Sequence, residues 1–176
     1  MILSVDELKE FLPELSSQDD TLLQQKLDAV EVMVRKYTNN NFQNRNIRFL
    51  ADSVGTVLNG SSPFLVKGDT IQVSESRVND GLYVLKSVSD ASVTVDRPMF
   101  TVDRNLVTKV EYPADVKIGV VNLMKWDFGN RDKVGVKSET ISRHSVTYFD
   151  LDHLNQVMGY PVSLLGFLEP YKKARF

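Results

Sequence analysis

Cysteine is absent from this sequence, and histidine is scarce. The lack of cysteine excludes disulfide frameworks, thiolate zinc sites, cysteine nucleophiles and iron–sulfur clusters. His144 and His153 are the only histidines in 176 residues, so a metal site built from several imidazoles is excluded as well. We therefore expect neither a bound metal nor a cofactor.

Neither sign of charge dominates the chain, which carries 21 basic and 23 acidic side chains for a net charge of -2. This balance excludes the uniformly basic surface of proteins that bind duplex DNA without sequence preference. No apolar run approaches the roughly 18 residues that a membrane-spanning helix needs. The first ten residues are acidic where a signal peptide is basic and then apolar. We expect no membrane association and no export.

Motifs of common catalytic sites are missing too. There is no G-x-S-x-G elbow to place a serine beside a histidine, and no glycine-rich phosphate loop of either common type. Asp150, Asp152 and His153 carry ligand atoms, but the rest of the calcium-loop pattern is absent, and turn capping is the favoured interpretation. His144 lies in a polar stretch that favours a solvated imidazole. We therefore expect a protein that is not an enzyme.

Two helices are predicted at the start of the chain. Ser4 and Glu7 have the spacing of a capping box, and Pro13 ends a first helix of about two turns. A second helix is predicted from Ser17 to about residue 37, and the run 38–41 ends it because asparagine tolerates left-handed conformations. Its apolar stripe, with the helical period of three and four, is formed by Leu23, Leu27, Val30, Val34 and Tyr37.

Between residues 46 and 110 the pattern changes to that of short β-strands. Runs rich in β-branched and aromatic residues are separated by turn residues, and the Asp80-Gly81 pair is a strong hairpin signal. Five or six short strands in so short a stretch favour a small barrel. The runs are 47–51, 56–58, 70–76, 82–88 and 92–96.

Helical patterns return after this segment. A third helix is predicted from Pro113 to Gly129, an extended strand or arm over 134–149, and a last short helix from Pro161 to Leu168 that Pro170 ends. The predicted fold class is thus α+β: a helical core of three to four helices, residues 1–45 and 111–176, with an inserted small β-barrel-like domain, residues 46–110.

The order of these elements carries a resemblance to a known family. The segments VDELKEFL, GVKSETISRHSVTY and the final LEPYKKARF, together with the second and third helices, resemble the head-tail connector (adaptor) proteins of long-tailed double-stranded DNA bacteriophages. The resemblance covers both ends of the chain and leaves out the β insertion. It implies a small, mainly helical virion structural protein that is not an enzyme.

The resemblance also implies partners and a location. Such proteins form a ring, commonly a dodecamer, beneath the portal protein, contact the next neck or tail-completion protein, and let DNA pass through the channel without sequence-specific binding. We therefore expect the chain in the neck of the virion and, during assembly, in the host cytoplasm. By this resemblance the portal-docking residues are Tyr171, Lys172, Lys173, Arg175 and Phe176. The residues that contact a neighbouring subunit are Lys137, Ser138, Glu139, Arg143 and Tyr148.

The distribution of charge is compatible with a head-to-tail ring. Residues 1–31 contain eight acidic and two basic side chains, whereas residues 170–176 contain three basic side chains and no acidic one. Such a ring needs two different and complementary surfaces on each subunit. Two alternatives stay open: another phage neck or tail-completion protein, and a nucleic-acid-binding small-barrel protein. Against the second, residues 46–110 contain seven basic and seven acidic side chains, and their aromatic residues are better interpreted as core.

Overall fold

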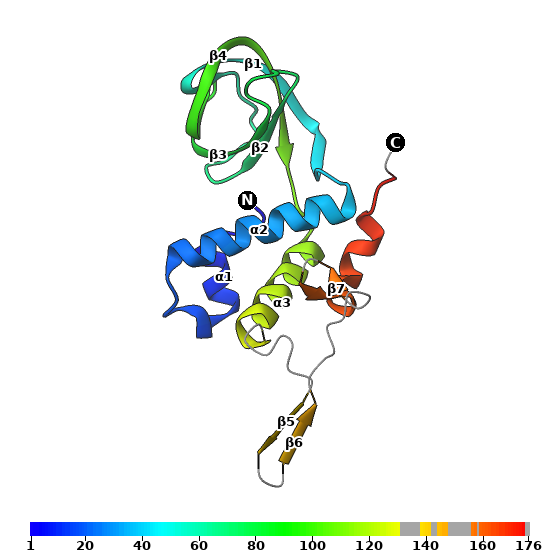
Figure 1. Cartoon of the computed structure of the whole chain (residues 1–176). Helices are drawn as coiled ribbons and strands as arrows, with labels where there is room; N and C mark the ends of the chain where they lie inside the picture. The colour runs from blue at the N-terminus through cyan, green and yellow to red at the C-terminus, as the bar shows by residue number, and fades with distance from the viewer. Residues whose placement is uncertain (131–137, 142–143, 148–155, 158, 175–176) are drawn as a thin grey trace. The chain divides into compact units, whose positions relative to one another are not determined.

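The computed structural model describes residues 1–130, 138–141, 144–147, 156–157 and 159–174 (Figure 1). The chain divides into two compact units. The β unit consists of Asn41–Tyr112 together with Met1, and the helical unit consists of Ile2–Asn40 and Pro113–Phe176. The boundaries drawn from the sequence were residues 46 and 110.

The helical unit contains three α-helices, α1 (Val5–Phe11), α2 (Asp20–Thr38) and α3 (Ala114–Asn130), and two 3-10 helices, η1 (Pro13–Leu15) and η3 (Val162–Tyr171), within the described residues. The predicted capping box is confirmed: the Glu7 backbone N–H donates to Ser4 Oγ, and the Ser4 N–H donates to the Glu7 carboxylate at 2.8 Å. The α2 helix begins three residues later than predicted, because the Asp19 carboxylate caps it by accepting from the Leu22 N–H.

The apolar stripe predicted for the second helix lies in the core of the helical unit. Leu23, Leu27 and Val34 of α2 are completely buried, whereas Tyr37 at the end of the stripe is only partly covered. The α2 helix contacts α1 and α3, and α3 contacts η3. An ion pair between Lys26 and the buried Asp127 links α2 to α3. Burial of Asp127 without such a partner would be costly, so this pair fixes how the two helices meet.

The β unit is a four-stranded antiparallel sheet (Figure 1). Its strands are β1 (Gln43–Asn59), β2 (Thr70–Ser74), β3 (Gly81–Val88) and β4 (Val93–Val110), in the order β1-β4-β2-β3 with an additional pairing between β3 and β4. The long β4 therefore pairs with all three other strands: with β1 along most of its length, with β2 through 106–110 and with β3 through 93–95.

The predicted barrel was wrong. The sheet does not close, because β1 pairs with β4 alone and remains an edge strand among the described residues. The prediction of five or six short strands was wrong, because the runs 47–51 and 56–58 are parts of one 17-residue strand. Gly55 lies between them with a φ of 59°, at shifts in the β1–β4 register, so the chain bends there without ending the strand.

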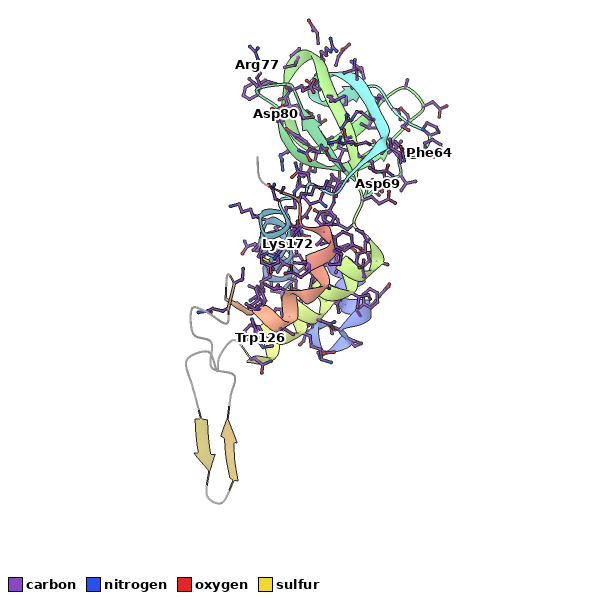
Figure 2. The ribbon with its side chains drawn as sticks, turned by 90° about the vertical axis from the view of Figure 1, so that its right-hand side faces the viewer. Phe64, Asp69, Arg77, Asp80, Trp126 and Lys172 are labelled. Atoms are coloured by element: carbon purple, nitrogen blue, oxygen red, sulfur yellow. The ribbon has the colours of Figure 1, made fainter. Side chains whose placement is uncertain are left out.

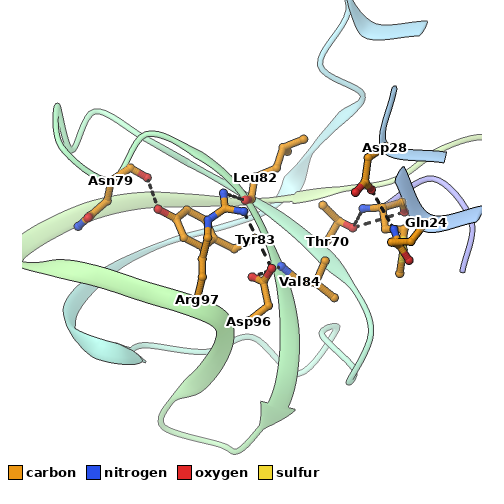
Figure 3. Close-up of polar contacts among 10 residues, drawn as sticks. Gln24, Asp28, Thr70, Asn79, Leu82, Tyr83, Val84, Asp96 and Arg97 are labelled. Carbon is orange, nitrogen blue, oxygen red and sulfur yellow. Dashed lines mark hydrogen bonds and ion pairs between the residues drawn. The ribbon is translucent and has the colours of Figure 1, made fainter. Parts of the chain in front are cut away.

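Polar side chains are buried inside the β unit beside its apolar core. The Asn79 amide donates to the Phe100 carbonyl at 2.9 Å and to Ser53 Oγ at 3.1 Å, while its oxygen accepts from the Phe100 N–H at 2.8 Å. Figure 3 shows the Tyr83 hydroxyl donating to the Asn79 carbonyl, with the Arg97 guanidinium over the Tyr83 ring at 4.4 Å from its centre. These contacts hold the 75–80 loop against β4.

Two short antiparallel pairs occur late in the chain: β5 (Ser138–Ile141) with β6 (His144–Thr147), and β7 (Gln156–Val157) with β8 (Tyr160–Pro161). The last helix differs from the prediction. Pro170 lies inside η3, which continues to Tyr171. Proline removes only its own N–H, and the Lys172 N–H still donates to the Glu169 carbonyl at 3.3 Å, so the turn closes past the proline.

Candidate functional site: the C-terminal segment

The C-terminal segment, Tyr171–Ala174, lies against the C-terminal end of α2. Its backbone is held there by the last carbonyl of the helix, because the Lys173 N–H donates to the Thr38 carbonyl at 2.8 Å. Helix ends leave carbonyls without intrahelical partners, so this bond satisfies one of them. Three of the five residues predicted to dock on the portal, Tyr171, Lys172 and Lys173, are therefore placed at one helix end. Arg175 and Phe176 lie outside the described residues.

Two asparagines of the predicted helix-ending run bind this segment. Asn39 adopts the left-handed conformation as the C-cap of α2, with φ 49° and ψ 35°, which confirms the prediction for the run. Its side-chain amide donates to the Ala174 carbonyl at 2.9 Å, and the amide of Asn40 donates to the Tyr171 carbonyl at 3.1 Å. Their role as partners of the C-terminal segment was not predicted, because residues more than 130 positions apart share no local pattern.

Lys172 is the centre of a charged cluster on the same helix end. Its ammonium lies 2.8 Å from Glu169 Oε1 and 4.1 Å from the centre of the Tyr37 ring, and the Tyr37 hydroxyl also donates to Glu169 at 2.9 Å. Hydrogen bonds from Lys172 and then Tyr37 lower the pKa of Glu169, and the hydrogen bond to Glu169 raises the pKa of Lys172. Both groups are exposed, so the cluster orients Lys172 rather than contributing much stability.

Tyr171 is oriented by the first turn of α3. Its hydroxyl donates to the Asp115 carboxylate, at 2.8 Å from one oxygen and 2.9 Å from the other. This hydrogen bond raises the pKa of Tyr171, because ionisation would place a phenolate beside a carboxylate. Lys173, in contrast, has an exposed side chain. The segment thus combines a fixed backbone with two surface lysines.

The residues predicted to contact a neighbouring subunit are only partly placed. Ser138 and Glu139 lie on β5 and pair with Thr147 and Val146 of β6, so the predicted arm contains a β-hairpin. Lys137, Arg143 and Tyr148 lie outside the described residues. The same is true of Asp150, Asp152 and His153.

A pocket of about 600 Å³ lies elsewhere in the helical unit, between the η1 region and the C-terminal half of α3. Figure 2 shows Trp126, one of its lining residues, near the end of α3. Its apolar lining is formed by Leu12, Leu15, Trp126 and Phe128, and its polar lining includes Glu14, Gln18 and Lys125.

Comparisons with known proteins identify no relative: no family model and no curated protein sequence matches the chain. In the part of the chain that the structure describes, no three acidic or histidine side chains are grouped as a metal site would need. No helix there is both long and apolar enough to cross a bilayer.

Proposed function

We propose that this chain is a virion structural protein, a head-tail connector that forms a ring beneath the portal protein and extends the DNA channel toward the tail. The C-terminal segment carries the proposal: it presents lysines and a tyrosine on a backbone fixed by Asn39, Asn40 and Thr38. Aromatic anchors with basic neighbours are typical of protein interfaces, and a fixed backbone lowers the entropy lost on docking.

Two further features support the same role. The resemblance of both chain ends to phage connectors implies portal docking through this segment and contacts between subunits through the 137–148 arm. The described part of that arm is a β-hairpin with strands β5 and β6. A hairpin offers two strand edges, which are suited to pairing or packing with a neighbouring copy.

Co-sedimentation with DNA-filled heads that carry portal but lack connector tests the proposal. The K172E/K173E variant is expected to bind these heads more weakly, most clearly at low salt, because surface charges act mainly on encounter. The matched control is K86E/R104E, which makes the same change of charge at two exposed positions of the β unit. We expect the control to bind as the unmodified chain does.

A truncation separates the contribution of Arg175 and Phe176 to binding from that of Tyr171–Ala174. Removal of Arg175 and Phe176 leaves every described contact of Tyr171–Ala174 in place, so the helical unit is expected to remain folded while attachment weakens. Normal binding by both the truncated chain and K172E/K173E would refute portal docking through this segment. Salt-sensitive binding of free DNA by the isolated chain, with no binding to heads, would favour the nucleic-acid-binding alternative.

A further inference from the structure

The loop between β1 and β2 exposes two large apolar side chains. Phe64 retains 67 % of its accessible surface and Val66 retains 61 %, while Leu65 between them is buried in the core of the β unit. Figure 2 shows Phe64 at the outer margin of this unit. We call residues 63–66 the knob. Exposed apolar side chains concentrated at one place indicate an interaction site more than isolated ones do.

The knob is held rigidly. Backbone hydrogen bonds close two successive turns, from the Leu65 N–H to the Ser62 carbonyl and from the Asp69 N–H to the Val66 carbonyl, both at 3.1 Å. The Asp69 carboxylate also accepts from the Val66 N–H at 2.9 Å and pairs with Lys109 at 2.9 Å. Lys109 in turn donates to the Phe64 carbonyl at 3.1 Å. A loop fixed in this way loses little entropy on binding, so its exposed phenylalanine is suited to act as an anchor.

The pocket of the helical unit has the complementary character. Its volume of about 600 Å³ exceeds the size of a phenylalanine and a valine side chain together, and its apolar lining includes the partly covered Trp126 and Phe128. Every chain carries both surfaces. Lys67 is exposed next to the knob, and at the pocket Glu14 carries the opposite charge and Lys125 the same charge, both of them exposed.

We propose that the knob of one copy inserts into the pocket of a second copy, with Phe64 as the anchor and Lys67 facing Glu14. The contact joins two different surfaces, so it is heterologous and repeats from copy to copy, as a ring requires. The inference rests on the proposed function, because only that function requires a ring. The assignment of the contact to the knob and the pocket rests on the structure of these two surfaces. One anchor and one charge pair form a small contact, so it adds to other subunit contacts instead of replacing them.

Site-directed cysteines test the contact, since the chain has none of its own. One protein carries Pro63→Cys, at the first residue of the knob, and a second carries Gln18→Cys at the pocket; both positions are exposed. When the two are mixed at high concentration and oxidised, a covalent heterodimer reports only contacts between different chains. Its yield is expected to exceed that of a mixture in which Asp90→Cys, at an exposed turn of the β unit, replaces Pro63→Cys.

Two further variants identify the side chains. Phe64→Asp in the P63C protein is expected to lower the heterodimer yield about tenfold or more, as the loss of an interface anchor does. Because Phe64 is exposed, circular dichroism should show this variant folded. Lys67→Glu should weaken the contact, and Glu14→Lys in the Q18C protein should restore it.

The proposal is overturned if the P63C and Q18C mixture gives no more heterodimer than the Asp90→Cys control, or if Phe64→Asp leaves the yield unchanged. Binding to heads distinguishes this failure from failure of the proposed function. If the chain binds heads normally but no heterodimer forms, only the knob contact is refuted. If the heterodimer forms but the chain does not bind heads, only the connector role is refuted.

Discussion

At the scale of single residues, asparagine side chains hold separate segments of this protein together by hydrogen bonds to backbone groups. Asn39 closes α2 with its backbone and binds the C-terminal segment with its side chain. Asn79 is 2 % exposed and binds both the N–H and the carbonyl of Phe100. A carboxamide donates and accepts at once, so it can satisfy backbone groups that a loop would otherwise bury without partners.

The hydrogen bond between Tyr171 and Asp115 predicts a measurable titration. The pKa of Tyr171 lies above its ordinary value of 10.0, so the bond is fully present below pH 10 and is lost as the pH rises through the folded pKa. Asp115→Asn should return the pKa of Tyr171 toward 10.0, because the neighbouring negative charge is removed. NMR of chains labelled with ¹³C-tyrosine measures this value.

Asp90→Asn, at an exposed turn of the β unit, is the matched control and should leave the Tyr171 titration unchanged. If Asp115→Asn also leaves it unchanged, the carboxylate does not hold the Tyr171 hydroxyl in solution.

At the scale of elements, local patterns predicted the helices better than the sheet. The α2 helix follows from its apolar stripe and its asparagine end, both of which are local patterns in the sequence. The barrel prediction was wrong because β1 continues through Gly55 and joins two runs that were predicted as separate strands, and because β4 combines the run 92–96 with the residues after it. Strand pairing depends on partners far apart in sequence, and no local pattern specifies it.

The candidate site shows the same limit. The family resemblance directed attention to Tyr171–Phe176, but Asn40, Asp115 and Tyr37, which bind or orient the described part of that segment, are distant in sequence. The residue types at these three positions do not indicate contact with the C-terminal segment. The sequence placed Tyr37 in the apolar stripe of the second helix and Asn40 in the run that ends it, and neither pattern points to the C-terminal segment.

The two glycines of α3 provide a matched test of helix packing. A Cβ atom on Gly119 would lie 2.4 Å from the Phe167 ring of η3, whereas a Cβ on Gly129 meets nothing within 4 Å. Gly119→Ala should therefore lower the free energy of unfolding by about 1 to 3 kcal/mol, the usual cost of overpacking. Gly129→Ala should raise it by up to about 1 kcal/mol through helix propensity.

Thermal or denaturant unfolding of the two variants measures both effects. Equal stability of Gly119→Ala and the unmodified chain would mean that Phe167 moves away from α3 at no cost, and that η3 is not fixed to the helix by this contact.

At the scale of the whole molecule, the chain enters the β unit at the start of β1 and leaves it at the end of β4, and these two strand ends are adjacent. The Glu111 N–H donates to the Phe42 carbonyl at 2.9 Å, the rings of Phe42 and Tyr112 lie 4.8 Å apart, and Gln43 pairs with Val110. The β unit also has a core of its own, which includes the completely buried Leu58, Ile71 and Val107.

A deletion tests whether the helical unit folds by itself. Residues 44–109 are replaced by an Asn-Gly turn, which joins Gln43 to Val110 with the two-residue geometry that favours antiparallel hairpins. Because Phe42, Glu111 and Tyr112 keep their mutual contacts, the helical unit is expected to keep its helical circular dichroism signal and a cooperative unfolding transition. The separate fragment 41–112 should show the β signal alone. Loss of the helical signal in the deletion variant would mean that the helical unit needs the inserted sheet in order to fold, and would contradict the division into two units.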